Sequence, residues 1–497
     1  MDVAHERFIP KEHGRLKSLE KAASDPYLTP TKPLIQRATQ ILHVKNDFDQ
    51  YFQPIFVAFG PLHHPRDDDS RLYRAESSKL QLAAKFIKGS GRTNEDFYNN
   101  VKEHLSSLKK CYEQKELDKW KENWDDDDLA WMFLVDGCAV LYLAHLDVNH
   151  YWEKVGCKNI DLVAFAKLDM FLLENQLPFQ LLQLLMSLCT WVPHRELDGK
   201  DEGGDSSHTD NGKAPEQVLM DSLKCFVHMN AMSLDPQHIS ISISDDRMPK
   251  SQTRQHDQQQ EEEEPAHLLE LLRRELIGDK LRKQGEKQQQ VKKSGGFWGI
   301  VKKYCSRQNK QTFRSVTEMK EKGIFFRRSK KGRVTDIEFS DSCCMATLKL
   351  PPIVVDDSTI PKLLNLIAYE MCPDFVNDYE ITTYVVFLDS LIDKAEDVKE
   401  LRVAGVLHNG LGSDEAVAEM FNRMSDNLVP NPELKYSDLL ERIQVHCNSL
   451  WASDLAQLYH TYFKSPWSFL VFIGVLAGLL LTGLQTYKEF NINPAIK

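Results

Sequence analysis

The chain has 497 residues, of which 42% are hydrophobic and 27% charged, and its formal net charge is -11 at pH 7. This length accommodates two or three domains of ordinary size with ample core, and the composition is typical of a folded body. The acidic balance argues against nucleic acid as the main partner, because phosphate binding requires a basic face. The ten cysteines form no C-x-x-C pair and no even spacing, so neither a zinc module nor a disulfide framework is indicated.

The first part of the chain, residues 1–195, reads as a helical N-terminal part. Apolar residues recur at helical spacing over residues 74–88 and 95–115, which predicts two amphipathic helices. A third apolar run follows four aspartates and ends near His145. Residues 162–188 are apolar on nearly all sides, which predicts a central core helix or helix pair interrupted at Pro178. We therefore expect four leucines of this stretch to be buried: Leu172, Leu173, Leu181 and Leu185.

A change of composition marks residues 196–312 as a low-complexity linker with a short helix in it. Residues 196–264 are rich in Asp, Gly, Ser, Gln and Glu, and they bury too little apolar surface to offset their ordering entropy. Much of this stretch is therefore expected to be disordered. A short amphipathic piece, residues 216–227, is expected to dock onto the folded body, and residues 267–284 are expected to be helical.

Residues 313–464 are predicted to form an α+β C-terminal part. Two short strands, 323–326 and 334–339, flank a turn at 329–332, which predicts a hairpin, and residues 345–355 are also rich in β formers. Helices are expected over residues 361–371, 381–391, 414–424 and 434–460. The predicted fold class is mainly α, with a helical body, a small β element and one C-terminal transmembrane helix.

The last part, residues 465–497, is predicted to be a membrane anchor with a short tail. Residues 467–487 carry no charge, and about 20 such residues suffice to cross a bilayer as a helix. The predicted anchor residues include Trp467, Phe472, Gly474, Gly478, Leu480 and Tyr487. No apolar signal segment opens the chain and no N-x-S/T sequon occurs, so we expect a single-pass C-terminal anchor and a cytoplasmic body. The charge bias across the anchor is too small to fix its orientation, and the sequence does not identify the membrane.

Two polar groups of the N-terminal part are candidates for metal chemistry. Asp125 to Asp128 carry carboxylates that hard cations prefer, but consecutive residues diverge around a helix, and acidic residues also cap a helix start. We favour the capping interpretation. His63 and His64 follow Gly60-Pro61, and neighbours in extended chain point to opposite faces, so a turn is favoured over a shared metal.

Three further motifs have a structural and a functional interpretation. Glu174, Asn175 and Gln176 form either a polar site in an apolar wall or groups satisfied internally at the Pro178 break, which we favour. The basic run of residues 327–333, RRSKKGR, is typical of a nuclear signal, an anionic-lipid patch or a solvated hairpin tip, and we favour the hairpin tip. Gly474 and Gly478 form a G-x-x-x-G motif that permits dimerisation of the anchor.

No phosphate-binding loop, nucleophile elbow or H-E-x-x-H motif occurs in the sequence. We therefore assign no catalytic, cofactor-binding or metal-binding residue, and we expect no cofactor.

Several strings of the chain, taken in order, resemble the plant family called domain of unknown function 247. They are FGPLHH (59–64), VDGCAVL (135–141), DMFLLENQLPF (169–179), LPPIVVDDST (350–359), NLIAYEMC (365–372) and the stretch 387–422, followed by the terminal anchor. Two positions depart from the family pattern: Phe59 replaces the usual Ile, and Pro65 a frequent Gly. The resemblance implies a plant membrane protein without an established catalytic activity, and some members are associated with self-incompatibility loci of grasses.

The favoured function is a membrane-anchored interaction, signalling or recognition protein that binds the bilayer through its C-terminal helix and an unidentified protein partner through its body. One alternative is a membrane-tethered metal-dependent hydrolase using Asp125 to Asp128, His63 or His64. A further alternative is a membrane-active homo-oligomer assembled through the anchor.

Overall fold

The structure is a computed structural model that describes two compact units, each assembled from several segments of chain. The described residues are 33–43, 48–65, 72–122, 124–152, 160–190, 192, 213–232, 264–278, 315–330, 332–341, 345–375, 378–425, 428, 436–448 and 466–492. The first unit comprises Met1–Ala231, Thr253–Gly285 and Ser358–Thr382, and the second comprises Met232–Gln252, Glu286–Asp357 and Thr383–Lys497. Most of the predicted linker, 196–312, lies outside the described residues. The four-part division of the chain stays a prediction.

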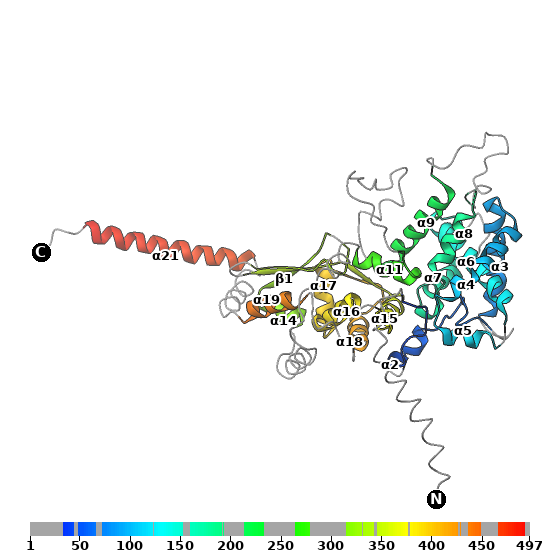
Figure 1. Ribbon diagram of the computed structural model, residues 1–497. Helices are drawn as coiled ribbons and strands as arrows, with labels where there is room; N and C mark the ends of the chain where they lie inside the picture. The colour runs from blue at the N-terminus through cyan, green and yellow to red at the C-terminus, as the bar shows by residue number, and fades with distance from the viewer. Residues whose placement is uncertain are drawn as a thin grey trace, which may run out of the picture. The chain divides into compact units, whose positions relative to one another are not determined.

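The described part of the first unit is helical (Figure 1). Its elements are α2 (Gln40–His43), η1 (Phe48–Tyr51), α3 (Tyr73–Ser90), α4 (Asn94–Lys109), α5 (Gln114–Trp120), α6 (Asp126–Val148), α7 (Ile160–Asp169), η2 (Leu173–Asn175), α8 (Phe179–Ser187), α9 (Pro215–Asn230), α11 (Leu268–Ile277) and α15 (Thr359–Glu370).

Helix α6 is the centre of the first unit and packs against α3, α4, α8 and α9. Every residue of α6 from Leu129 to Asp147 is buried except Trp131. The stretch around residues 162–188 lies beside this helix as a pair, α7 and α8, separated by η2. Its Pro178 stands directly before the first residue of α8, where the missing N–H is harmless. The burial predicted for the four leucines is confirmed, because each is at most 3% exposed.

Two predicted helices of this unit end earlier than the apolar pattern suggested. The helix expected to reach residue 115 ends at Lys109, because the chain then forms a bridge between Tyr112 and Ile35 before α5 begins. The helix expected over residues 267–284 ends at Ile277, where Gly278 adopts a φ of 81°. Left-handed backbone at such a position favours glycine and stops a helix. Residues 279–284 lie outside the described part.

The second unit contains a three-stranded sheet, a two-stranded sheet and several helices. Strands β1 (Ile324–Arg328), β3 (Ala346–Leu350) and β2 (Glu338–Asp341) pair in that order, and β4 (Ile353–Val355) pairs with β5 (Leu407–Asn409). Pro351 and Pro352 separate β3 from β4, as proline at a strand exit predicts. The described helices of this unit are α14 (Val316–Glu321), α17 (Ala395–Val403), α18 (Asp414–Ser425), α19 (Ser437–Cys447) and α21 (Pro466–Ile492), and α16 (Glu380–Leu391) includes the boundary of the two units.

The predicted hairpin of the first two strands is wrong. β1 runs parallel to β3 with Phe326 opposite Leu348, and β2 runs antiparallel to β3 with Phe339 opposite the same Leu348. β3 is therefore the central strand, and its alternate residues Ala346, Leu348 and Leu350 are buried. The physical reason is that a tight hairpin needs a loop of two to five residues, whereas nine residues separate Arg328 from Glu338. The predicted fold class is otherwise confirmed: the described chain is mainly helical, with a few short strands and an apolar C-terminal helix.

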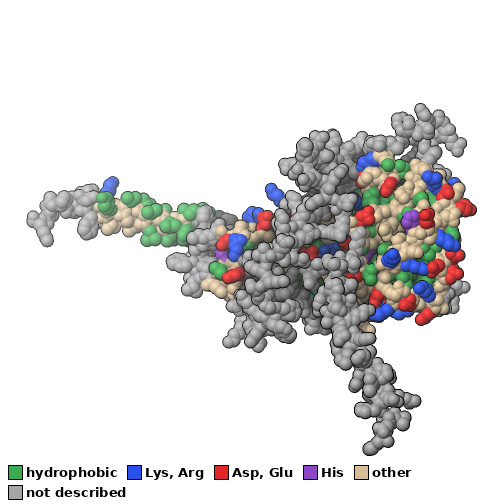
Figure 2. Space-filling model, in the orientation of Figure 1, with side chains coloured by type: hydrophobic (Ala, Val, Ile, Leu, Met, Phe, Trp, Pro, Cys, Tyr) green, Lys and Arg blue, Asp and Glu red, His purple; other side chains and the backbone are tan. Residues whose placement is uncertain are grey.

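Helix α21 differs from every helix of the first unit in what its surface presents. Its side chains from Leu470 to Tyr487 are exposed, and Figure 2 shows hydrophobic side chains along its length. Two described helices are long and apolar enough to cross a membrane, Asp126–Val148 and Leu470–Lys488. The apolar window of the first is 94% buried and that of the second 0% buried, so α6 has the properties of a core helix.

Candidate functional site: the polar junction around residues 55–63

A buried carboxylate fixes the start of the loop formed by residues 55–63. Asp169, at the end of α7, accepts hydrogen bonds from the backbone N–H groups of Ile55 (3.1 Å), Phe56 (2.7 Å) and Val57 (2.9 Å). Burial raises the pKa of the Asp169 carboxyl, and the three N–H donors offset only part of that effect. A side chain that receives three backbone donors has an architectural role, because its oxygens are occupied.

The side-chain amide of Asn175 also holds the 55–63 loop through hydrogen bonds to backbone groups. Its Oδ1 accepts from Phe59 N at 2.7 Å, and its Nδ2 donates to the carbonyl oxygens of Val57 and Asp169 at 3.0 and 2.8 Å. At Gly60 the backbone has a φ of +73°, and an added Cβ would lie 2.9 Å from the carbonyl oxygen of Gln176. Both the conformation and the close approach therefore require glycine at this position of the FGPLHH motif.

Gln176 connects its own segment to α11. Its Nε2 donates to the carbonyl oxygens of Met170 (2.9 Å) and Leu172 (2.7 Å), and its Oε1 accepts from Leu269 N at 3.0 Å. Tyr112 OH donates to the Gln176 carbonyl at 3.0 Å. The side-chain amide of Gln176 is thus fully engaged with backbone groups around the break at Pro178.

A buried ion pair lies beneath the tip of the loop. Asp136, in the middle of α6, accepts from Gly60 N at 2.9 Å and from Lys79 Nζ at 2.6 Å. Lys79 also donates to the Ala58 carbonyl at 2.7 Å and pairs with Glu76 at 2.8 Å. Burial alone would lower the pKa of Lys79, but the charges of Asp136 and Glu76 outweigh it, and the pKa is raised. Lys79 is therefore held as a cation, and it has no character of a catalytic base.

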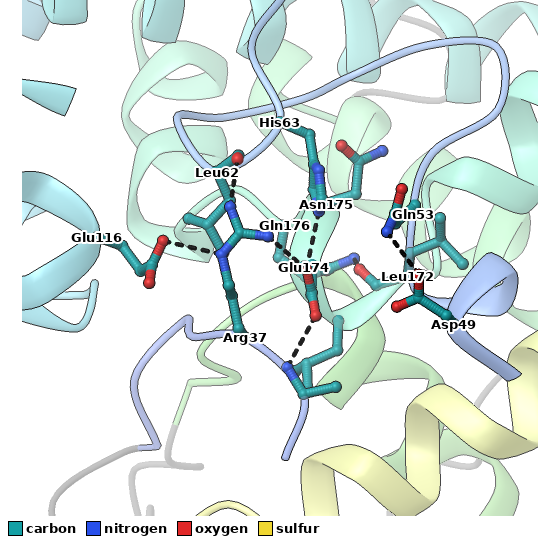
Figure 3. Close-up of polar contacts among 12 residues, drawn as sticks. Arg37, Asp49, Gln53, Leu62, His63, Glu116, Leu172, Glu174, Asn175 and Gln176 are labelled. Carbon is teal, nitrogen blue, oxygen red and sulfur yellow. Dashed lines mark hydrogen bonds and ion pairs between the residues drawn. The ribbon is translucent and has the colours of Figure 1, made fainter. Parts of the chain in front are cut away.

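Glu174 connects the segment at Arg37 and Ala38 to His63 at the end of the loop (Figure 3). Its Oε2 lies 2.9 Å from Arg37 Nη1 and 2.9 Å from His63 Nε2, and its Oε1 accepts from Ala38 N at 3.0 Å. Arg37 also pairs with Glu116 at 3.0 Å. Burial would raise the pKa of Glu174, but the bonds to His63, Ala38 and Arg37 outweigh it, and the pKa is lowered. The carboxylate remains ionised and takes part in an ion-pair network.

His64 faces a different environment from His63. Its ring lies edge-on to the indoles of Trp120 and Trp124, each at a centroid distance of 5.4 Å. Its Nδ1 atom is buried and has no hydrogen-bond partner among the described residues. Burial lowers the pKa of His64, so the imidazole is neutral in this aromatic setting. The two imidazoles therefore do not share one site.

The aspartate tetrad starts helix α6, as the capping interpretation predicted. Asp125 Oδ1 accepts from Asp127 N (2.8 Å) and Asp128 N (3.0 Å), and Asp128 Oδ2 accepts in return from Asp125 N (3.0 Å). This is a capping box. These backbone donors lower the pKa of Asp125. Asp127 pairs with Lys102 at 2.6 Å and Asp126 with Lys109, so the four carboxylates do not converge.

Helix α15 contributes two further polar clamps to the first unit. Asn365 accepts from Leu173 N at 2.7 Å and donates to the carbonyl oxygens of Tyr51 and Pro361 at 2.7 and 2.8 Å. Glu370 is fully buried and accepts from Arg273 Nε, Ile381 N, Thr382 N and Thr382 Oγ1 at 2.8 to 3.0 Å. Asp374, just beyond α15, accepts from Leu34 N at 2.6 Å. Groups far apart in sequence are joined here by buried polar contacts.

Within the part of the chain that the structure describes, no three His, Cys, Asp or Glu side chains are grouped so that they could hold a metal ion. The polar groups of the 55–63 junction bind backbone and one another. The internal interpretation of Glu174, Asn175 and Gln176 is therefore confirmed, since each has the partners described above. What this arrangement does chemically is to hold a loop in one conformation.

Four participants in the junction escaped the sequence reasoning: Arg37, Lys79, Asp136 and Asp169. Asp136 and Lys79 carried a detectable signal, because each is a charged residue at a buried position of a helix, and such charges are rarely buried without a partner. Nothing local marked Arg37, whose carboxylate partners Glu116 and Glu174 lie 79 and 137 residues away.

The model of a plant family described as "Plant protein of unknown function", domain of unknown function 247, matches residues 35–481. The chain belongs to this family. Four residues of the junction lie in strings that carry the resemblance: Asp136, Asp169, Glu174 and Asn175. The α15 residues Asn365 and Glu370 lie in another of these strings.

Two proteins of Arabidopsis thaliana are similar to this chain. The protein named UPF0481 protein At3g47200 is 26% identical over 454 residues, which is 88% of this chain and 82% of that protein. The protein named Putative UPF0481 protein At3g02645 is 28% identical over 177 residues, which is 36% of this chain and 33% of that protein. No solved structure matches.

The family has no established biochemical activity, and no catalytic motif is evident in this chain.

Proposed function

We propose that this protein is a membrane-anchored interaction protein, in which α21 inserts into a bilayer and the cytoplasmic body presents a surface to a protein partner in recognition or signalling. The observation that carries the proposal is the exposure of an apolar helix. Side chains of α21 such as Val471, Leu480 and Leu484 are exposed at 61–67%, and burying such a surface in lipid removes its cost in water.

The comparison with α6 strengthens this interpretation. The two helices have similar mean hydropathy, 1.7 for α6 and 1.8 for Leu470–Lys488, but α6 is covered by protein. A soluble body covers its apolar helices, and α21 is covered by none of the described residues. The predicted anchor residues lie on α21: Phe472, Leu480 and Tyr487 are 40%, 65% and 67% exposed. A Cβ at Gly474 or Gly478 would meet nothing within 4 Å, which leaves the dimerisation alternative open.

The chemistry of the first unit argues against catalysis by its buried carboxylates. The buried carboxylates of Asp136, Asp169 and Glu370 are used by backbone N–H groups and by Lys79 or Arg273. General acid–base catalysis needs a titratable group that can reach a substrate, and these oxygens face their own chain. The described cysteines are free, and Cys138, Cys189, Cys372 and Cys447 are buried, which suits a reducing compartment.

The test of the anchor is deletion of residues 466–497. The full chain is expected to float with membranes and to resist extraction with alkaline carbonate, whereas the deleted chain is expected in the soluble fraction. Replacing three α21 residues with charged ones, Leu476→Arg, Leu480→Arg and Leu484→Arg, provides a variant of full length that should behave like the deletion. Retention of both variants on carbonate-washed membranes would refute the single-anchor proposal.

A further inference from the structure

The basic run of residues 327–333 contains cations without partners. Arg327, Lys330 and Arg333 are exposed, and within the described ranges their side chains make no ion pair and no hydrogen bond. In a chain with a net charge of -11, three such cations within seven residues are an uncompensated local charge. Arg328, between them, is only half-buried.

Four other basic residues of the same unit take part in ion pairs with carboxylates of that unit. Lys320 pairs with Glu400, Lys349 with Glu338 at 3.1 Å, Arg402 with Asp414 at 2.9 Å and Arg442 with Asp341 at 2.6 Å. The carboxylates on β2 are therefore already engaged by cations other than the basic run. The one acidic residue that directly follows the run, Asp336, has a buried Oδ2 atom. The side chains of Arg327, Lys330 and Arg333 are therefore exposed to solvent, and no carboxylate of the described part of their unit pairs with them.

The sheet holds this segment in place. Ser329 N donates to the Leu350 carbonyl at 2.7 Å, which fixes the end of β1 against the end of β3. Tyr436 OH donates to the Val334 carbonyl at 3.1 Å, which fixes the other end of the segment against the start of α19. Because β1 and β2 flank β3 rather than each other, residues 329–337 cross an end of the sheet. The three cations are thus displayed on a segment attached at both ends.

The covalent structure brings this surface within reach of the proposed anchor. Helix α19 is attached to the sheet through Arg442 and Asp341 and ends at Cys447, and α21 begins at Pro466. The chain between Cys447 and Pro466 reaches at most about 65 Å when fully extended. A short tether raises the effective concentration of a second contact on the same membrane.

We propose that Arg327, Lys330 and Arg333 form a docking surface for anionic lipid headgroups of the bilayer that α21 enters; this inference rests on the proposed membrane anchoring. An irregular segment with three exposed cations suits a field of diffuse negative charge, such as a leaflet rich in phosphatidylserine. Each Lys or Arg near such a leaflet changes its affinity by about five-fold, so two of these residues together contribute about 25-fold.

The experiment uses the full chain in nanodiscs of pure phosphatidylcholine or of phosphatidylcholine mixed with phosphatidylserine. A fluorescent amino acid at the exposed Ser340 of β2 reports proximity by energy transfer to a headgroup-labelled lipid. We expect higher transfer in the anionic nanodiscs, and a fall toward the neutral level in the R327Q/K330Q variant. The matched control is K399Q/R423Q, which removes two exposed cations from α17 and α18 and should leave the transfer unchanged. High salt should abolish the difference in the unaltered chain, because screening acts on exposed charges.

The outcomes separate the anchor from the docking surface. Equal energy transfer in neutral and anionic nanodiscs, with the chain still embedded, would overturn the docking surface and leave the anchor intact. An equal fall in both double variants would also overturn it, because the effect would then come from net charge alone. A chain that binds anionic nanodiscs reversibly and neutral ones not at all would support the docking surface and refute the anchor.

Discussion

Acid should destabilise the first unit through His267, the N-cap of α11. The Nδ1 atom of His267 accepts a hydrogen bond from Glu270 N at 3.2 Å, so the ring proton is on Nε2, which is buried without a hydrogen-bond partner among the described residues. The ring is fully buried and edge-on to Tyr369 at a centroid distance of 4.9 Å. Protonating Nδ1 would place a second N–H donor against the Glu270 N–H and a charge on a fully buried ring.

Burial lowers the pKa of His267 from 6.5 to about 4; Arg274 acts in the same direction, and Glu270 and Asp374 oppose it. Because the folded pKa lies below the unfolded one, the unfolded state binds more protons between these two values. The contribution of the neutral His267 to the free energy of unfolding is therefore fully present above about pH 6.5. It decreases as the pH falls toward 4 and does not change further below that pH. The difference between the unfolded and folded pKa values corresponds to about 3 kcal/mol of unfolding free energy, of which about 2 kcal/mol is lost at pH 5.

Hydrogen exchange of the α11 amides in the full chain measures this effect locally, which avoids assuming one two-state transition for two units. After correction for intrinsic rates, protection should fall about 30-fold between pH 7.5 and pH 5. His267→Asn retains an acceptor at the N-cap but does not titrate in this range, so its protection should be lower at neutral pH and change less with pH.

The matched control is His104→Asn, which removes an exposed histidine on α4 and should retain the pH dependence of the unaltered chain. An identical decline of protection in the His267→Asn variant would refute the argument, because the acid sensitivity would then arise elsewhere.

Three further predictions concern packing and the aspartate tetrad. Leu173→Ala should cost about 2–5 kcal/mol of unfolding free energy, because Leu173 is 0% exposed, and an unchanged urea midpoint would contradict this. Gly137→Ala should cost about 1–3 kcal/mol by the same assay, since the new Cβ would meet Leu185 Cδ1 at 2.4 Å; a gain in stability would show that the core yields there. The double change Asp126→Asn and Asp127→Asn should leave the fold intact, and calorimetric titration with Mg²⁺, Mn²⁺ or Ca²⁺ should show no stoichiometric binding before or after it. Micromolar binding that this change abolishes would revive the hydrolase alternative.

Local sequence determined the elements whose signals are themselves local. The uncharged run of α21 is continuous, so its length and hydropathy could be read without knowing any contact. The same holds for the capping box at Asp125 and Asp128, whose partners are three residues apart, and for the break at Pro178, which follows from a missing N–H. The apolar character of residues 162–188 on nearly all sides also predicted the burial of Leu173 and Leu181.

Only the tertiary structure decided the strand order and the polar junction. The sequence could not select β3 as the partner of both β1 and β2, because pairing depends on which strands the tertiary packing brings side by side. Asp374 and Leu34 are 340 residues apart, Asn365 and Leu173 are 192 apart, and Asp136 and Gly60 are 76 apart. A buried carboxylate or amide must find a partner, but its chemistry does not specify which backbone group that will be. The sequence therefore marked these residues as polar and unusual, and the packing of distant segments assigned their partners.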